Sequence, residues 1–289
     1  MKISWEKVER LGKTTIFLPA FAAPVSIREC IAEEIIQALG PGNDLYGLED
    51  SLFNDDDAHV WPTAFDLKIL NILYSDNLVP GMSRKEALEA AKVALAQTPE
   101  GKKKREWTST SRLYHTEYHR SLTSEEDTVR ETALERASNF SKQLPKNDHR
   151  RGEVLRRQAI IAKNDDNIEK AIALSEEAIS IFRLGLPKDS PRLARLLSNY
   201  AFYLYLDDQY EEALTVLEEA QPVLAAHALE SEFAFGLLLK AFAHLRSDNW
   251  VDAKSAARET IAWARYVYGA DSEKVRDWTA LFRKNDLNL

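Results

Sequence analysis

Small apolar residues recur through the second half of the chain at two fixed spacings. Ala159, Ala201 and Ala241 are 42 and then 40 residues apart. Two further sets of positions share these spacings: Ala171, Ala213 and Ala253, and Ile168, Tyr210 and Trp250. Three columns with common offsets predict an internal repeat of about 40 residues.

Each repeat has the hydrophobic period of a helical hairpin. In the middle repeat, apolar residues at helical spacing occupy 193–206 and 210–223, and the polar stretch 207–209 separates them. Equivalent patterns predict repeats at 152–184, 192–224 and 233–268, followed by a capping helix at 272–284. The alanine columns have a steric reason, because antiparallel helices approach within about 8–10 Å only where the crossing side chains are small.

The first 100 residues show no such repeat. Ser26 and Ser83 each stand three residues before a glutamate, which is the sequence of a helix-capping box. The spacing of Trp5, Val8 and Leu11 predicts one short helix, followed by an extended or looped stretch.

A basic linker over 98–105 (TPEGKKKR) marks the predicted domain boundary. We therefore predict a mostly helical N-terminal region over 1–100, of unassigned family, and a helical repeat domain over 106–289.

The middle repeat resembles the tetratricopeptide repeat (TPR). The residues that match its pattern are Leu197, Tyr200, Ala201, Leu204, Ala213, Leu217 and Ala220. The offset of 42 is similar to the longer repeats of the kinesin-light-chain type, in which a glycine ends the unit. Gly185 and Gly269 stand at such places. The resemblance covers 150–289 well, 106–145 weakly and the first 100 residues not at all.

The resemblance implies an all-α fold, a right-handed α-solenoid of antiparallel helix pairs, preceded by the irregular N-terminal helical region. It also implies a concave groove lined by the first helix of each pair. The solvent-facing positions of those helices are the candidate peptide-binding residues: Arg156, Arg157, Arg195, Ser198, Asn199, Phe202, Tyr205, Phe235, Leu238 and Phe242. Asn199 matches an asparagine that in the family bonds to the backbone of a bound peptide.

The same positions have a structural interpretation that the sequence leaves open. Phe235, Leu238 and Phe242 would be buried if the following helix covers them. Arg156 and Arg157 would pair with neighbouring carboxylates rather than with a ligand.

No catalytic, metal-binding or cofactor-binding motif is complete. His115 and His119 share a helix face, but Thr116 stands where the zinc-protease pattern requires glutamate. The acidic run 54–57 lacks the spacing of a calcium loop. The segment 12–14 (GKT) lacks the upstream glycine of a phosphate-binding loop. We predict no catalytic residue, no metal and no cofactor.

Composition limits the classes of partner that the chain is expected to bind. A net charge of -8 argues against nucleic acid or an anionic membrane as the main partner. No apolar run is long enough for a membrane-spanning helix. Cys30 is the only cysteine, which suits a reducing compartment and predicts a cytoplasmic location.

Three functions follow as hypotheses. The leading one is a non-enzymatic adaptor or regulator that binds a peptide or protein segment in the groove. The second is a signalling protein whose N-terminal region acts as an effector by contact. The third is a nucleic-acid-binding regulator that uses a basic patch: 102–105, Arg150, Arg151, Arg156 and Arg157. Homo-oligomerisation stays open.

Overall fold

The computed structural model describes residues 2–7, 10–18, 22–40, 48, 51–54, 59–97 and 108–287. The chain divides into two compact units. One consists of Met1–Ala22 with Ser26–Thr108, and the other of Ala23–Val25 with Ser109–Leu289.

The N-terminal unit begins with an antiparallel hairpin. Its elements are β1 (Lys2–Lys7), β2 (Arg10–Thr15), α1 (Pro24–Ala38), the short 3-10 helix η1 (Leu52–Asn54), α2 (Ala64–Leu73) and α3 (Arg84–Ala96). The short helix predicted from Trp5, Val8 and Leu11 is wrong, since Trp5 pairs with Leu11 across the hairpin and Val8 lies outside the described residues. A few apolar residues fit a period of two nearly as well as one of 3.6, so periodicity cannot separate strand from helix in so short a run.

Helix capping agrees with the sequence pattern at one of two positions. Ser83 caps α3, with its hydroxyl accepting from the amide of Glu86 while the Glu86 carboxylate accepts from the amide of Ser83. By contrast, α1 begins at Pro24, two residues before the predicted cap at Ser26. Proline suits the first turn of a helix, where its missing N–H has no helical acceptor to lose.

A buried carboxylate holds η1 to α2. Asp66 accepts hydrogen bonds from the Ser51 hydroxyl at 2.5 Å, the Leu52 amide at 3.0 Å and the Thr63 amide at 2.8 Å. Asp66 and Ser51 are each 1% exposed. Because a buried carboxylate is stable only when hydrogen-bonded, this cluster fixes the chain before α2 in one position.

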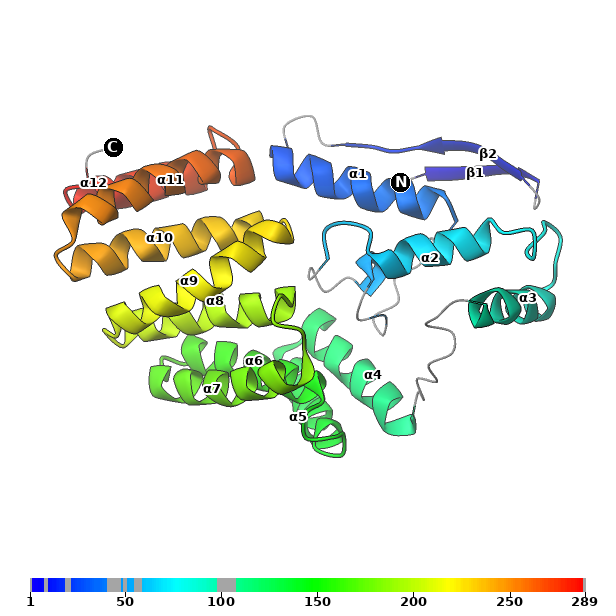
Figure 1. The fold of residues 1–289 in the computed structure, drawn as a ribbon, viewed down its shortest axis with the longest axis horizontal. Helices are drawn as coiled ribbons and strands as arrows, with labels where there is room; N and C mark the ends of the chain where they lie inside the picture. Colours follow the sequence, from blue (N-terminus) through cyan, green and yellow to red (C-terminus); the bar gives the residue numbers. More distant parts are fainter. Residues whose placement is uncertain are drawn as a thin grey trace. The chain divides into compact units, whose positions relative to one another are not determined.

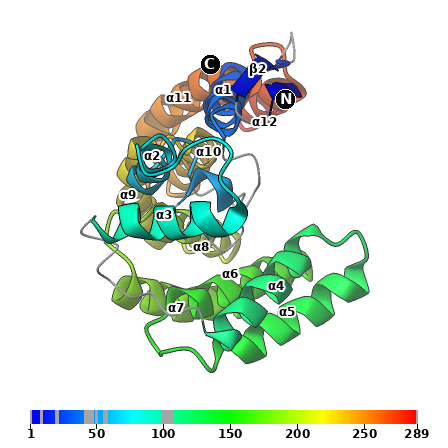
Figure 2. The ribbon, with the colours of Figure 1, turned by 90° about the vertical axis from the view of Figure 1, so that its right-hand side faces the viewer.

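The second unit is a stack of antiparallel helix pairs (Figure 1 and Figure 2). Its helices are α4 (Ser109–Thr123), α5 (Asp127–Ser141), α6 (His149–Asn164), α7 (Ile168–Gly185), α8 (Pro191–Leu206), α9 (Tyr210–Ala226), α10 (Glu230–Arg246), α11 (Trp250–Tyr268) and α12 (Glu273–Lys284). The predicted all-α repeat fold is confirmed in this unit.

Both alanine columns lie where the two helices of a repeat meet. Each of their six members is 1% exposed or less: Ala159, Ala171, Ala201, Ala213, Ala241 and Ala253. These methyl groups leave room for close helix packing, and α12 covers the last pair with Val275, Trp278 and Phe282, all buried.

The turn between the two helices repeats the same backbone geometry. Asp166, Asp208 and Asp248 have positive φ values of 57°, 60° and 56°. In each turn the amide of the next residue donates to a carbonyl five residues earlier, as Asn249 does to His244 at 2.8 Å. This is the hydrogen bonding of a Schellman motif at a helix C-terminus. Its left-handed backbone position accommodates aspartate better than a β-branched residue.

Because of this backbone geometry, we expect two substitutions of Asp248 to have different effects on stability. Asp248→Val places a β-branched residue in the left-handed region and should lower the free energy of unfolding by about 1–2 kcal/mol. Asp248→Gly removes the Cβ penalty and should leave stability unchanged or raise it by up to about 1 kcal/mol. Urea unfolding followed by circular dichroism measures both, and equal midpoints for the two variants would contradict the turn geometry.

Candidate peptide-binding face

The first helices of the three complete repeats, α6, α8 and α10, lie side by side and form one surface, here called the first-helix face. Tyr203 of α8 packs in a cluster with Ala159 and Ala162 of α6. Phe202 of α8 meets Phe235 of α10 edge to face, with ring centroids 5.4 Å apart. The face is therefore built within a single unit of the chain.

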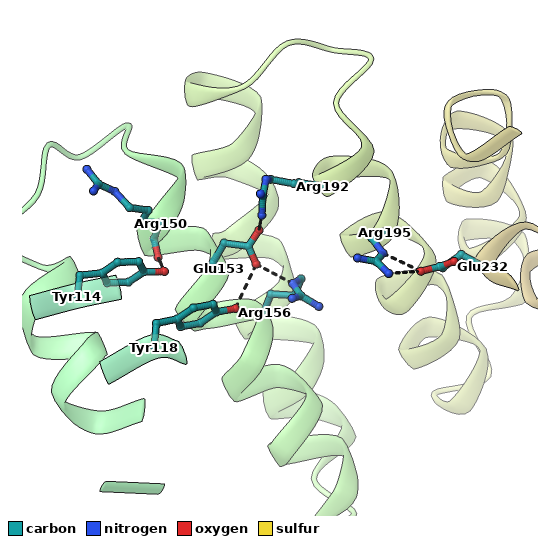
Figure 3. A network of polar contacts seen from close by, with 8 residues as sticks. All are labelled: Tyr114, Tyr118, Arg150, Glu153, Arg156, Arg192, Arg195 and Glu232. Atoms are coloured by element: carbon teal, nitrogen blue, oxygen red, sulfur yellow. Dashed lines mark hydrogen bonds and ion pairs between the residues drawn. The ribbon is translucent and has the colours of Figure 1, made fainter. Parts of the chain in front are cut away.

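A buried polar network joins α4, α6 and α8 at one end of this face (Figure 3). The Glu153 carboxylate accepts from the Arg156 Nε at 2.9 Å, from an Arg192 Nη at 3.3 Å and from the Tyr118 hydroxyl at 3.4 Å. The side chain of Glu153 is 6% exposed. The network ties α4, α6 and α8 to one carboxylate.

Two opposing effects set the pKa of Glu153. Burial raises it, but the positive charges of Arg156 and Arg192 outweigh burial and lower the pKa to about 2. Burial, together with the nearby Glu153 carboxylate, raises the pKa of Tyr118 to about 12. At neutral pH, Glu153 is therefore an ionised carboxylate and Tyr118 a neutral donor.

A second ion pair joins α8 to α10. Arg195 donates from Nε at 2.7 Å and from Nη2 at 2.6 Å to one Glu232 oxygen (Figure 3). This ion pair stands at the repeat positions of Glu153 and Arg192, with the charges exchanged. Glu153 precedes Arg195 by 42 residues, and Arg192 precedes Glu232 by 40. The two pairs differ in exposure: the Arg195 and Glu232 side chains are 21% and 26% exposed.

Three of the predicted binding residues do not face solvent. Ser198, Leu238 and Phe242 are 2%, 7% and 8% exposed, so their prediction as surface positions is wrong. Ser198, Leu238 and Arg156 occupy one repeat position, and the first two are buried there while the third lies in the buried network. Phe242 stacks on Phe282 of the capping helix at 5.3 Å.

Arg156 pairs with a neighbouring carboxylate, as the structural interpretation of its position predicts. It is held by Glu153 within the network, and Arg150 is likewise bound to Asp148 at 2.6 Å and to Ser111 at 2.9 Å. Both arginines belong to the predicted basic patch. Its segment 102–105 lies outside the described residues.

Seven predicted residues are partly exposed: Arg156, which is held in the network, and Arg157, Arg195, Asn199, Phe202, Tyr205 and Phe235. Arg157 and Asn199 are equivalent positions of successive repeats. Within the part of the chain that the structure describes, neither side chain makes a hydrogen bond or an ion pair with another residue. The Lys163 ammonium lies 5.7 Å from the Phe202 ring, so a cation borders the aromatic pair.

Sequence reasoning missed Tyr118 and Glu232. Both are polar contacts to the neighbouring repeat, and nothing in their local sequence distinguishes them from solvent-exposed positions. The charge exchange between Glu153–Arg192 and Arg195–Glu232 was the available signal, once positions were compared at offsets of 42 and 40.

Other candidate chemistry finds no site in the described part of the chain. No three of its histidine, cysteine, aspartate and glutamate side chains are grouped as metal ligands would be. Segment 12–14 lies inside β2 rather than in a loop before a helix. Residues 55–57 of the acidic run lie outside the described residues. None of the described helices combines the length and apolar character needed to cross a bilayer.

Comparison with known proteins gives two family matches. Residues 150–226 match the tetratricopeptide repeat family, and residues 3–93 match a family described as a protein of unknown function (DUF2927). A search of curated proteins finds no match. Among solved structures, the chain is similar to a Podosopora anserina putative kinesin light chain with nearly identical TPR-like repeats, at 12% identity, covering 61% of this chain and 89% of that chain, with a TM-score of 0.44.

The repeat columns, the helix pairs and the family match agree. Residues 150–226 of this chain form tetratricopeptide repeats. Repeats of this family typically form non-catalytic scaffolds for protein–protein interaction.

Proposed function

We propose that the first-helix face binds an extended peptide segment of a protein partner, and that the chain acts as a non-enzymatic adaptor or regulator. The observation that carries the proposal is the Asn199 side chain. It is half-buried at the centre of the face, and its amide has no partner among the described residues. An amide offers both donors and acceptors, which matches the alternating N–H and C=O groups of an extended backbone.

The surroundings of Asn199 support a peptide rather than a small polar ligand. Phe202 lies less than one turn away on α8 and contacts Phe235 of α10, which gives an apolar surface for a side chain of the partner. Arg157, at the position equivalent to Asn199 on α6, provides a guanidinium suited to a carboxylate. A peptide could therefore contact backbone-binding, apolar and cationic groups in one line across three helices.

Two arginines of the predicted basic patch are bound to carboxylates within the protein. Arg150 and Arg156 are occupied by Asp148 and Glu153. Phosphate binding depends on available cations, so these contacts favour a protein partner over a nucleic acid.

A binding experiment that needs no identified partner tests the proposal. Random peptides displayed on phage are selected on the intact chain, and the enriched peptides are synthesised with a fluorescent label. We expect Asn199→Ala to weaken their binding about tenfold, as measured by fluorescence anisotropy, because two neutral hydrogen bonds are lost.

Asn139→Ala is the matched control. Asn139 is an exposed asparagine of α5 outside the first-helix face, so its replacement should leave binding unchanged. Equal affinities for the wild type and Asn199→Ala, or an equal loss in both variants, would contradict the proposed site. A library that yields no binder would contradict peptide binding by this chain.

A further inference from the structure

The two equivalent ion pairs differ in a way that bears on partner choice. Glu153 and Arg192 are 6% and 12% exposed and belong to the interior. Arg195 and Glu232 are 21% and 26% exposed and lie on the first-helix face, and Arg195 is one helical turn from Asn199 on α8. The second pair is therefore within reach of a segment bound at Asn199.

Two Arg195 contacts converge on a single carboxylate oxygen. Nε and Nη2 donate to the same Glu232 oxygen, at 2.7 and 2.6 Å. These are the donors that a guanidinium offers to a carboxylate approaching in its plane. Glu232 thus occupies the place that an acidic side chain of a partner would take.

The acidic side chains of α8 and α10 determine which carboxylates Arg195 can meet on the first-helix face. Helix α8 contains no acidic residue, and α10 contains Glu230 and Glu232. Glu230 is buried, so Glu232 is the acidic side chain that α8 and α10 present on the face. Without it, α6 and α8 would present Arg157, Lys163 and Arg195 with no acidic side chain of α8 or α10 exposed beside them.

We propose that Glu232 is a specificity-determining residue, an internal competitor that discriminates against partners carrying a carboxylate at the Arg195 position. This inference rests on the proposed peptide binding at the first-helix face. An acidic partner that approaches the Nε edge of Arg195 must displace Glu232, so one charge-assisted contact is exchanged for another of the same kind and little affinity is gained. A partner with a neutral residue there leaves the pair intact.

Parallel selections test the role of Glu232. The same phage library is selected on the wild-type chain, on Glu232→Gln and on the double variant Glu232→Gln with Arg195→Gln. We expect Glu232→Gln to enrich peptides with an added aspartate or glutamate and to bind them about tenfold more tightly than the wild type does. The double variant should lose this gain because the guanidinium is absent.

Glu219→Gln is the matched control. Glu219 pairs with Arg183 at 2.8 Å on the second helices α7 and α9, so its neutralisation changes net charge equally without touching the first-helix face. Thermal unfolding of every variant verifies that the repeats are folded. An equal gain of acidic peptides with Glu219→Gln would show a general charge effect and overturn the inference.

The outcomes separate this inference from the proposal on which it rests. If Asn199→Ala weakens binding while Glu232→Gln changes neither the selected sequences nor their affinities, the face binds peptides and the role of Glu232 is wrong. If Asn199→Ala has no effect on the peptides of any selection, the proposed function fails, and this inference fails with it.

Discussion

Replacing Glu153 by alanine is expected to lower the free energy of unfolding of the repeat domain by about 3–5 kcal/mol. The substitution leaves Arg156 and Arg192, whose side chains are 24% and 12% exposed, without their shared carboxylate, and it removes the acceptor of the Tyr118 hydroxyl. Because the network connects α4, α6 and α8, the loss should loosen the first of the complete repeats.

Urea unfolding of the isolated variant measures this loss. Glu219→Ala is the control, because the exposed pair that it breaks contributes less than about 1 kcal/mol. If Glu153→Ala were no more destabilising than Glu219→Ala, the buried network would not stabilise the fold.

The same network predicts a pH dependence. The pKa of Glu153 is lowered from its ordinary 4.5 to about 2 in the folded protein, so the unfolded chain takes up the proton first as pH falls. Its contribution is fully present above pH 4.5 and is lost progressively toward pH 2, amounting to roughly 3 kcal/mol. Glu153→Ala should therefore flatten the acid side of the stability curve, and an unchanged slope would contradict the lowered pKa.

The second large effect is expected at Gly185, the last residue of α7. A Cβ at this position would lie 2.1 Å from the backbone oxygen of Asn147, in the segment that precedes α6. Since backbone rather than a flexible side chain must move, we expect Gly185→Ala to lower the free energy of unfolding by about 3 kcal/mol.

Gly269, two repeat lengths away, provides the comparison. A Cβ at this position would meet no atom within 4 Å, but the φ of Gly269 is +92°, which only glycine adopts without strain. Gly269→Ala should therefore cost about 1–2 kcal/mol through its backbone alone. Urea unfolding that ranked the two variants in the opposite order would show that the contact with Asn147 is not restrictive.

The repeats could be predicted from sequence because close helix packing leaves a periodic trace. Ala201 and Ala213 are buried at a crossing where only a methyl group fits, and that requirement recurs in each repeat. The capping box at Ser83 could be predicted because its hydrogen bonds are local. The hairpin Lys2–Thr15 could not, since its pairing depends on contacts between strands that a short apolar run does not specify.

The candidate site was predictable only in part, because exposure depends on the neighbouring element. Phe202 and Phe242 occupy the same repeat position, yet only Phe242 is covered by the capping helix. Glu153 stands in a strongly charged helix whose sequence suggests solvent, and its burial follows from Tyr118 and Arg192 on two other helices. Side-chain partners at such sequence separations are set by the fold and leave no local signature.

Site-specific photo-crosslinking tests the central claim most directly. Benzoylphenylalanine is placed at Phe202 of α8, at Phe235 of α10 or at the exposed Thr215 of α9, and each protein is irradiated with a phage-selected peptide. Binding on the first-helix face predicts crosslinks from positions 202 and 235 and none from 215. Crosslinks from position 215 alone would place the peptide on the second helices and contradict the account.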